Sequence, residues 1–209
     1  MAKVLLLNGS PHPNGCTATA LQEMIRTFEA EGIETELIQV GNQNIRGCIA
    51  CGKCGSTGKC VFDDLVNETA QKLASADGLV VGSPVYYSSP NGTLISFMDR
   101  LFYSTGGMSK HMKVGAAVVS CRRGGNTASF DVLNKYFTIS GMPVASSSYW
   151  NNIHGFTAED AQKDLEGLQT MRNLAKNMAF LIRAIANEKE RAGLPTVERG
   201  SFTSFCDGK

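Results

Sequence analysis

Four cysteines stand close together in the run GCIACGKCGSTGKC. Cys48, Cys51, Cys54 and Cys60 follow the spacing C-x2-C-x2-C-x5-C, which gathers four thiols in one loop and is rarely needed to build a core. Thiolates clustered in this way bind a metal or an iron-sulfur cluster, or they pair as a redox-active dithiol. The chain has seven cysteines, an odd number, and enough apolar residues for a large core, so a disulfide framework is not expected.

The spacing of these cysteines favours a cubane iron-sulfur cluster over zinc. In the ferredoxin run C-x2-C-x2-C-x3-C-P the last cysteine serves another cluster. Here the final gap is longer and Val61 stands in place of proline, which allows Cys60 to return to the same cluster. Structural zinc sites usually draw two ligand pairs from separated knuckles. Thiols that are unmetallated or oxidised are the other alternative, and the sequence identifies no partner for Cys121 or Cys206.

Short apolar runs alternate with amphipathic segments along the chain. Strands that are unbroken apolar runs, each followed by a helix, indicate a parallel sheet covered on both faces. The expected fold is therefore a doubly wound α/β domain with five parallel strands in the order 2-1-3-4-5. The predicted strands are residues 4–7, 34–40, 78–82, 114–120 and 143–147, and the predicted helices are residues 17–31, 65–74, 94–102, 128–139 and 158–187.

Composition limits the class of protein. A chain of 209 residues with 43% hydrophobic residues can bury one core, so we expect one domain at residues 1–190 and a tail at 191–209 with no domain of its own. Lys plus Arg (20) nearly balances Asp plus Glu (19), which argues against nucleic acid as a partner. The N-terminal apolar run is too short for a signal peptide or a membrane span. We expect a cytoplasmic protein that binds neither nucleic acid nor membrane.

In doubly wound sheets, ligands bind beyond the carboxyl ends of the strands where the strand order reverses. The loop after the first strand, NGSPHPNGCT, opens directly onto a helix, so backbone N–H groups, the hydroxyls of Ser10 and Thr17 and the helix dipole converge on an anion. It is neither a Walker A loop nor a GxGxxG loop, because no lysine follows Gly15 and the glycine spacing differs. The loop predicts a phosphate site, with an ordinary Gly/Pro-rich turn as the alternative.

The loop after the third strand, SPVYYSSPNG, places Tyr86 and Tyr87 at the same switch point. Aromatic rings stack on flat conjugated ligands, although either tyrosine could instead pack against the next helix. A phosphate site one strand away from two aromatic rings describes a ligand with a phosphate tail and a planar ring. FMN fits that description.

A third loop, after the fourth strand, carries Arg122 and Arg123. Positive charge near the flavin N1 edge would stabilise the anionic hydroquinone and raise the reduction potential. Alternatively, one guanidinium could grip the 2′-phosphate of NADPH. The remaining alternative is a pair of solvated loop arginines.

Four segments together resemble the NADPH-dependent FMN reductase and flavodoxin-like superfamily, in the branch that includes the iron-sulfur flavoproteins: NGSPHPNGCT, SPVYYSSPNGT, VVSCRRGGN and YWNNIHG. The resemblance covers most of the chain and implies a flavodoxin-like fold, FMN as cofactor, NAD(P)H as co-substrate and a homodimer or higher oligomer. It also implies a 4Fe-4S cluster on the four-cysteine loop. The family usually carries Asn where this chain has Cys16. The implied FMN contacts are Ser10, His12, Cys16, Thr17 and Ala18 in the first loop, Pro84, Val85, Tyr86 and Tyr87 in the second, and Cys121, Arg122, Arg123, Gly124 and Gly125 in the third.

These features predict an FMN-dependent NAD(P)H oxidoreductase that passes electrons to a small acceptor such as a quinone, a nitro or azo compound, or free flavin. Hydride transfer from a nicotinamide to a flavin needs no protein acid or nucleophile, so no catalytic side chain is expected. One alternative is an iron-sulfur flavoprotein that carries single electrons between a protein donor and acceptor. Another is a non-catalytic redox or metal sensor.

Overall fold

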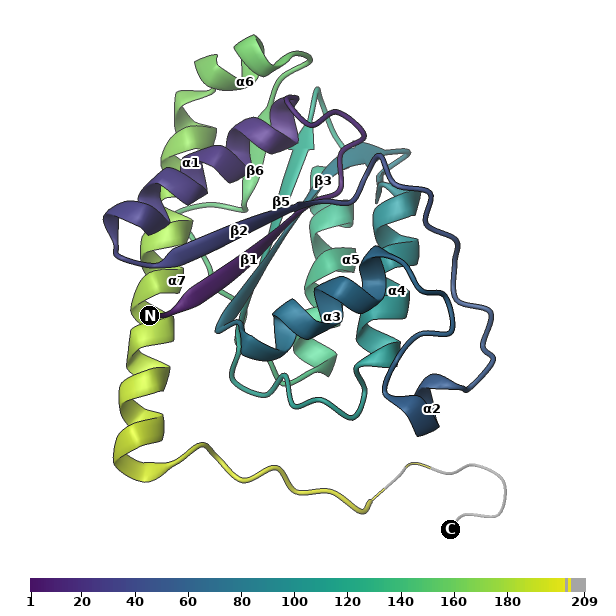
Figure 1. Cartoon of the computed structure of the whole chain (residues 1–209). Coiled ribbons are helices and arrows are strands. Elements are labelled where there is room, and N and C mark those ends of the chain that lie inside the picture. The colour runs from purple at the N-terminus through teal and green to yellow at the C-terminus, as the bar shows by residue number, and fades with distance from the viewer. Residues whose placement is uncertain (202, 204–209) are drawn as a thin grey trace.

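The computed structural model describes residues 1–201 and 203, and its centre is a parallel sheet (Figure 1). Five strands pair in the order β2-β1-β3-β5-β6, which confirms the predicted flavodoxin-like order. A sixth strand, β4, was not predicted; it pairs antiparallel with the end of β3. The strands are β1 (Lys3–Asn8), β2 (Glu34–Gln39), β3 (Gly78–Tyr86), β4 (Ser89–Pro90), β5 (Val114–Cys121) and β6 (Asn152–His154).

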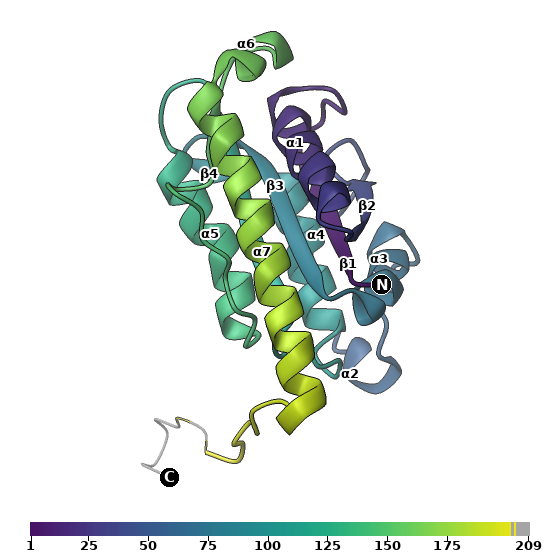
Figure 2. The same ribbon diagram turned by 90° about the vertical axis from the view of Figure 1, so that its left-hand side faces the viewer.

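Helices cover both faces of the sheet, as the continuous apolar strands require. One core lies between the sheet and helices α1 and α7, which run side by side in Figure 2. The second core lies between the opposite face and helices α3, α4 and α5. The helices are α1 (Cys16–Ala30), α2 (Cys54–Thr57), α3 (Leu65–Ser75), α4 (Gly92–Ser104), α5 (Asn126–Ile139), α6 (Ala158–Lys163) and α7 (Leu165–Ala192).

The fifth parallel strand lies later in the chain than the sequence predicts. Residues 143–147 make only an isolated bridge, between Val144 and Gly115, and the strand is β6. The serines that follow turn to α7 instead: the Ser147 hydroxyl donates to the Thr170 carbonyl at 2.6 Å, and Asn177 donates to the Ser146 carbonyl at 2.8 Å. The bond to the Ser146 carbonyl occupies a backbone acceptor that a strand would use, and the prediction of a strand at 143–147 was wrong.

The predicted single helix at residues 158–187 is two helices. Asp164 ends α6 and caps α7, and its carboxylate accepts from the backbone N–H groups of Gly167 at 2.9 Å and His154 at 2.7 Å. A local side-chain-to-backbone bond of this kind starts a new helix rather than continuing the old one. The second helix, α7, runs to Ala192.

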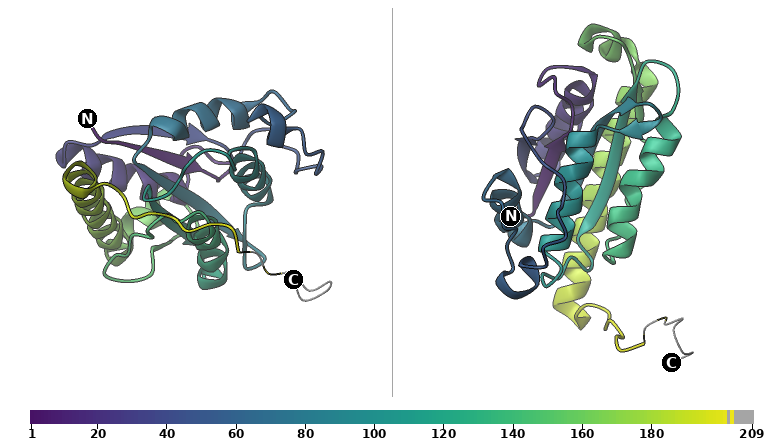
Figure 3. Two further views of the ribbon diagram at one scale, coloured as in Figure 1. Left: turned by 90° about the horizontal axis from the view of Figure 1, so that it is seen from below. Right: turned by 90° about the vertical axis from the view of Figure 1, so that its right-hand side faces the viewer.

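The chain beyond α7 crosses the end of the molecule opposite the carboxyl ends of the strands (Figure 3). The Pro195 carbonyl lies 3.1 Å from a ring nitrogen of His111. The rest of the expected tail, residue 202 and residues 204–209, lies outside the described residues, and so does Cys206. Among residues 1–201, no helix combines the length and apolar character needed to cross a membrane.

Close packing of β5 against α5 makes Gly115 sensitive to substitution. A Cβ added there would lie 2.5 Å from the Phe137 ring, well inside van der Waals contact. We expect Gly115→Ala to lower the free energy of unfolding by roughly 1–3 kcal/mol, as overpacked cores do. Urea unfolding measures it, with Gly107→Ala as the control because nothing other than its chain neighbours lies within 4 Å of its added Cβ. Equal stability of the two variants would contradict the packing argument.

Candidate functional site

Three loops meet at the carboxyl edge of the sheet. The Gly9 N–H donates to the Gly82 carbonyl at 2.8 Å, which joins the loop after β1 to the end of β3. Pro84 is in register with Ser120 at the end of β5. A Cβ on Gly125 would lie 2.7 Å from the Ser88 hydroxyl, so the loop after β5 packs against the β3–β4 turn. The three predicted flavin loops are therefore contiguous.

The first loop is held in shape by β2. Asn8 is buried and donates to the Gln39 side chain at 2.7 Å, and Gln39 donates to the Ser10 carbonyl at 2.6 Å. The Asn8 side chain also accepts from the Ser10 N–H at 3.1 Å. Gly41 packs directly against this loop, because a Cβ there would come within 2.3 Å of the Gly9 carbonyl oxygen. A loop fixed on both sides in this way can present its N–H groups to a ligand without reorganisation.

The described helices fall into two groups at their N-termini: four are capped by a side chain, whereas α1, α5 and the four-residue α2 are not. Side chains of Asp64, Asn91, Thr157 and Asp164 cap helices α3, α4, α6 and α7. In residues 1–201, no side chain caps α1 or α5, whose N-cap residues are glycines, and neither has an acidic residue in its first turn. Uncapped first-turn N–H groups at the positive end of a helix bind anions. The start of α1 therefore fits a phosphate.

The individual side chains of the first loop are placed as follows. Ser10 is buried, and its hydroxyl oxygen accepts from the N–H of His12, whose side chain is exposed. The hydroxyls of Thr17 and Ser120 share a hydrogen bond of 2.7 Å. Ala18 is buried.

Cys16 lies at the start of α1, and its thiol donates to the Thr157 carbonyl at 3.1 Å. Burial raises the pKa of this thiol, and the charges of Asp160 and Glu159 raise it further. A thiol turned toward α6 in its neutral form is suited to closing the loop rather than to attack on a substrate.

The second loop leaves its aromatic rings open. Tyr87 is fully exposed and Tyr86 is 45% exposed. Tyr87 and Ser88 both have positive φ, at 50° and 60°, in the turn between β3 and β4. Neither ring is buried against α4. The alternative that the sequence left open, in which the tyrosine only packs against the next helix, therefore does not apply to Tyr87. Pro84 and Val85 are half-buried beneath the turn.

The third loop combines a buried thiol with exposed charges. Cys121 is buried, burial raises the pKa of its thiol, and its carbonyl accepts from the Gly155 N–H at 3.1 Å. Arg122 and Arg123 are exposed, and the Arg122 guanidinium lies over the Phe156 ring at 5.4 Å. Gly124 is exposed, and Gly125 has a φ of 86° that favours glycine. The loop can place positive charge at the site's rim.

The four-cysteine loop leaves the carboxyl edge of the sheet but does not stay there. The chain runs from the end of β2 down the outside of α4 to α2, near the opposite end of the molecule (Figure 1). Cys48, Cys51, Cys54 and Cys60 all line one small cavity with Tyr103 and Ser104, the last residues of α4. Because the cysteine run follows the second predicted strand, the sequence alone predicts that it lies at the same edge of the sheet as the flavin loops. That prediction was wrong, because the loop is long enough to follow α4 through its whole length.

The cavity brings the four thiols together without a closed metal site. Cys48 and Cys51 are exposed, Cys54 and Cys60 are half-buried, and none of the four forms a disulfide within the described residues. Across residues 1–201, no three His, Cys, Asp or Glu side chains are gathered tightly enough to hold a single metal ion. Four thiols around a common cavity are nevertheless the donor set that an iron-sulfur cluster requires.

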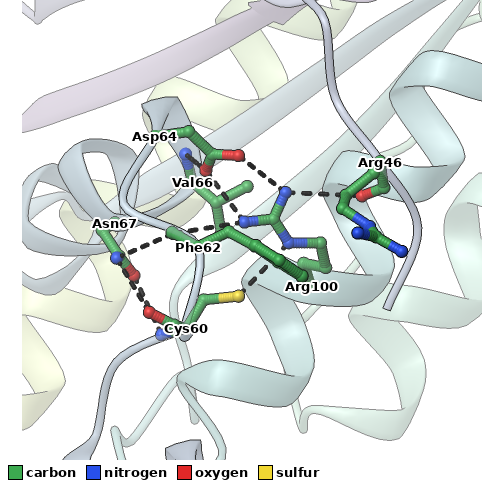
Figure 4. Close-up of polar contacts among 7 residues, drawn as sticks. All are labelled: Arg46, Cys60, Phe62, Asp64, Val66, Asn67 and Arg100. Carbon is green, nitrogen blue, oxygen red and sulfur yellow. Dashed lines mark hydrogen bonds and ion pairs between the residues drawn. The ribbon is translucent and has the colours of Figure 1, made fainter. Parts of the chain in front are cut away.

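A buried arginine that no sequence motif indicates borders this cavity, and Figure 4 shows its polar contacts. The Arg100 guanidinium donates to both carboxylate oxygens of Asp64, at 2.7 and 2.9 Å, and its Nε donates to Cys60 Sγ at 3.2 Å. Burial works against the charge, but the bonds to Asp64 and Cys60 outweigh it and raise the pKa of Arg100. One sequence feature could have indicated that Arg100 is buried: it stands at helical spacing on the apolar face formed by Leu94, Phe97 and Leu101.

Asp64 should be critical for stability because it neutralises this buried charge. Asp64→Asn retains a good N-cap for α3 but removes the carboxylate that pairs with Arg100. We expect the free energy of unfolding of metal-free protein to fall by roughly 3 kcal/mol, the cost of leaving a buried charge without its partner. Urea unfolding tests this, with Asp63→Asn as the exposed neighbouring control. Equal losses in the two variants would contradict it.

Comparisons with known proteins agree with this architecture. Residues 2–157 match the family described as NADPH-dependent FMN reductase. An iron-sulfur flavoprotein of Methanocaldococcus jannaschii is 34% identical over 190 residues, covering 88% of this chain and 98% of its own. A flavodoxin structure from the domain Archaea has a TM-score of 0.56 at 16% identity, covering 88% of this chain and 99% of its own.

A similar likeness holds for the structure of an NAD(P)H:quinone oxidoreductase from Methanothermobacter marburgensis. Its TM-score is 0.63 at 15% identity, covering 85% of this chain and 94% of its own. At such identities the two structures support the flavodoxin-like fold alone. The family match and the 34% identical relative show more: this chain belongs to the NADPH-dependent FMN reductase family and is a relative of the iron-sulfur flavoproteins.

Proposed function

We propose that the protein is an FMN-dependent oxidoreductase that takes hydride from NAD(P)H, carries a 4Fe-4S cluster on its four-cysteine loop and passes electrons to a small acceptor such as a quinone. The observation that carries the flavin part is the uncapped start of α1 beside the β3–β4 turn and the loop after β5. The family match supports the same conclusion. The name of the Methanocaldococcus jannaschii relative supports the cluster.

The chain's own residues would bind and orient the cofactor. The first-turn N–H groups of α1 and the Ser10 hydroxyl would hold the phosphate of FMN, and the exposed Tyr86–Tyr87 turn would lie against its ring. Bound FMN supplies the chemistry of accepting hydride. Arg122 and Arg123 would provide the positive rim that attracts the 2′-phosphate of NADPH. We assign no side chain as acid, base or nucleophile.

We include a homodimer in the proposal. The fully exposed Tyr87 and the exposed pair Tyr149 and Trp150 leave large aromatic surface uncovered in one copy. Surface of this kind is enriched where subunits meet. Light scattering on the purified protein tests this part, and a monomer at micromolar concentration would contradict it.

Reductase activity is tested by NADPH oxidation under anaerobic conditions with a quinone. Turnover well above that of the same concentration of free FMN supports the proposal. Turnover equal to that of free FMN, from protein that retains its flavin, argues instead for a carrier of single electrons. The cavity lined by all four cysteines would hold the cluster of such a carrier as well.

A further inference from the structure

Arg100 carries a fully buried positive charge whose contacts reach across the wall of the cysteine cavity. Its side chain has no exposed surface, and it lies on α4 between the cavity and the core. Its guanidinium satisfies Asp64 through two hydrogen bonds and also donates to the carbonyls of Phe62 at 3.3 Å and Arg46 at 3.4 Å. The remaining donor, Nε–H, is directed to Cys60 Sγ. Ion pairing alone would not require that last contact.

Cys60 is also fixed through its backbone. Asn67, on α3, accepts from the Cys60 N–H at 2.9 Å and donates to the Cys60 carbonyl at 3.1 Å (Figure 4). Two helices therefore hold this one cysteine, α3 by its backbone and α4 by its sulfur. Cys48 and Cys51, by contrast, are exposed on the loop. Of these three cysteines, Cys60 is the one whose position is set before any ligand binds.

We propose that Arg100 is a positioning residue for the cluster: it fixes the Cys60 sulfur as a preformed ligand and, through the Nε–H to Sγ hydrogen bond, raises the cluster's reduction potential. The inference rests on the proposed cluster but goes beyond it, since it assigns a role to a residue outside the ligand set. Hydrogen bonds to ligand sulfurs are a recognised determinant of cluster potential. The one-electron reduction adds negative charge, which an N–H donor and a buried cation stabilise.

Three variants distinguish this positioning role from a purely structural role and from a general effect of charge. Arg100→Met removes both the donor and the charge, whereas Arg100→Lys retains a charge for Asp64 but has no N–H at the position of Nε. Arg46→Met is the matched control, because Arg46 lies over the same Phe62 ring at 4.8 Å, as Arg100 does at 5.0 Å, but is exposed. If Arg100→Met proves insoluble, Arg100→Lys carries the test.

The readouts are the midpoint potential of the cluster, the rate of iron loss to a chelator, and the melting temperature of metal-free protein. We expect both Arg100 variants to lose iron about 10-fold faster, because removing the hydrogen-bonding partner of a ligand typically lowers metal affinity by roughly 10- to 100-fold. We also expect a more negative potential, by about 59 mV for each tenfold loss of preference for the reduced form. Arg46→Met should match the wild type.

Each other outcome overturns the inference. A lower melting temperature with unchanged potential and iron loss would make Arg100 purely structural. An equal potential shift in Arg46→Met would make the effect one of general charge. Wild-type protein that takes up no iron or sulfide under anaerobic reconstitution would overturn the proposed cluster as well. If the wild type binds the cluster and the Arg100 variants match it in midpoint potential and rate of iron loss, the role of Arg100 is overturned but the proposed cluster is not.

Discussion

Cys60→Ser is expected to abolish the iron-sulfur cluster while leaving FMN bound. Cys60 is held by Arg100 and Asn67 before ligation, so its loss removes the fixed point around which the exposed cysteines would close. The flavin loops lie at the other end of α4, whose 13 residues span about 20 Å. Iron and acid-labile sulfide should fall to background, and FMN per chain should equal that of the wild type.

Cys206→Ser is the control for Cys60→Ser, since it removes a thiol outside the four-cysteine loop. It should retain the full iron content. Full iron in Cys60→Ser would mean that Cys60 is not a ligand. Loss of FMN together with iron would mean that the two sites depend on each other, contrary to their placement at opposite ends of α4.

Gly15→Asp should raise the free energy of unfolding of the FMN-free protein and weaken FMN binding. Gly15 is the N-cap of α1 with extended backbone that aspartate can adopt, at φ −90° and ψ −167°. A capping carboxylate stabilises a helix by about 1 kcal/mol. The same carboxylate would occupy the N–H groups that we assign to the phosphate. Two like charges 4 Å apart interact by about 4 kcal/mol at an effective dielectric constant of 20, which corresponds to a loss of affinity on the order of 10²- to 10³-fold.

Fluorescence titration of apoprotein with FMN and urea unfolding without FMN measure these two effects. Gly15→Ala controls for the added Cβ, which would lie 3.2 Å from the Cβ of the exposed His12. It should bind FMN far more tightly than Gly15→Asp. Unchanged FMN affinity in Gly15→Asp would place the phosphate elsewhere. Riboflavin, which lacks the phosphate, should bind the variant and the wild type alike.

The sheet could be predicted because its information is local. Unbroken apolar runs such as Val4–Leu7 and 78–82 are buried on both faces, and each precedes an amphipathic helix. The order of the strands fixes which loops meet, so the three flavin loops could be predicted to adjoin before any contact was known. Their packing through Gly9 and Gly125 confirms that expectation.

The features that escaped prediction depend on tertiary contacts. The contacts of Cys60 with Arg100 and Asn67 set the path of the cysteine loop. Arg100 lies 40 positions further along the chain and Asn67 lies within a helix, so the spacing of the cysteines indicates neither contact. The fifth parallel strand is β6 and not residues 143–147, where Asn177 of α7 donates to the Ser146 carbonyl that a strand would use. A periodic sequence pattern predicts a helix or a strand. It does not show which side chains from elsewhere in the chain will bond to the backbone groups that the helix or strand would use.

The most direct test of the account is the cofactor content of protein purified without oxygen. FMN released by heat, together with iron and acid-labile sulfide, should be quantified per chain on the same sample. We predict about one FMN and about four iron and four sulfide per chain, with broad visible absorption that is lost in air. Protein that neither retains nor binds FMN would contradict the central claim, and FMN without iron or sulfide would leave a flavin reductase whose cysteine loop holds no cluster.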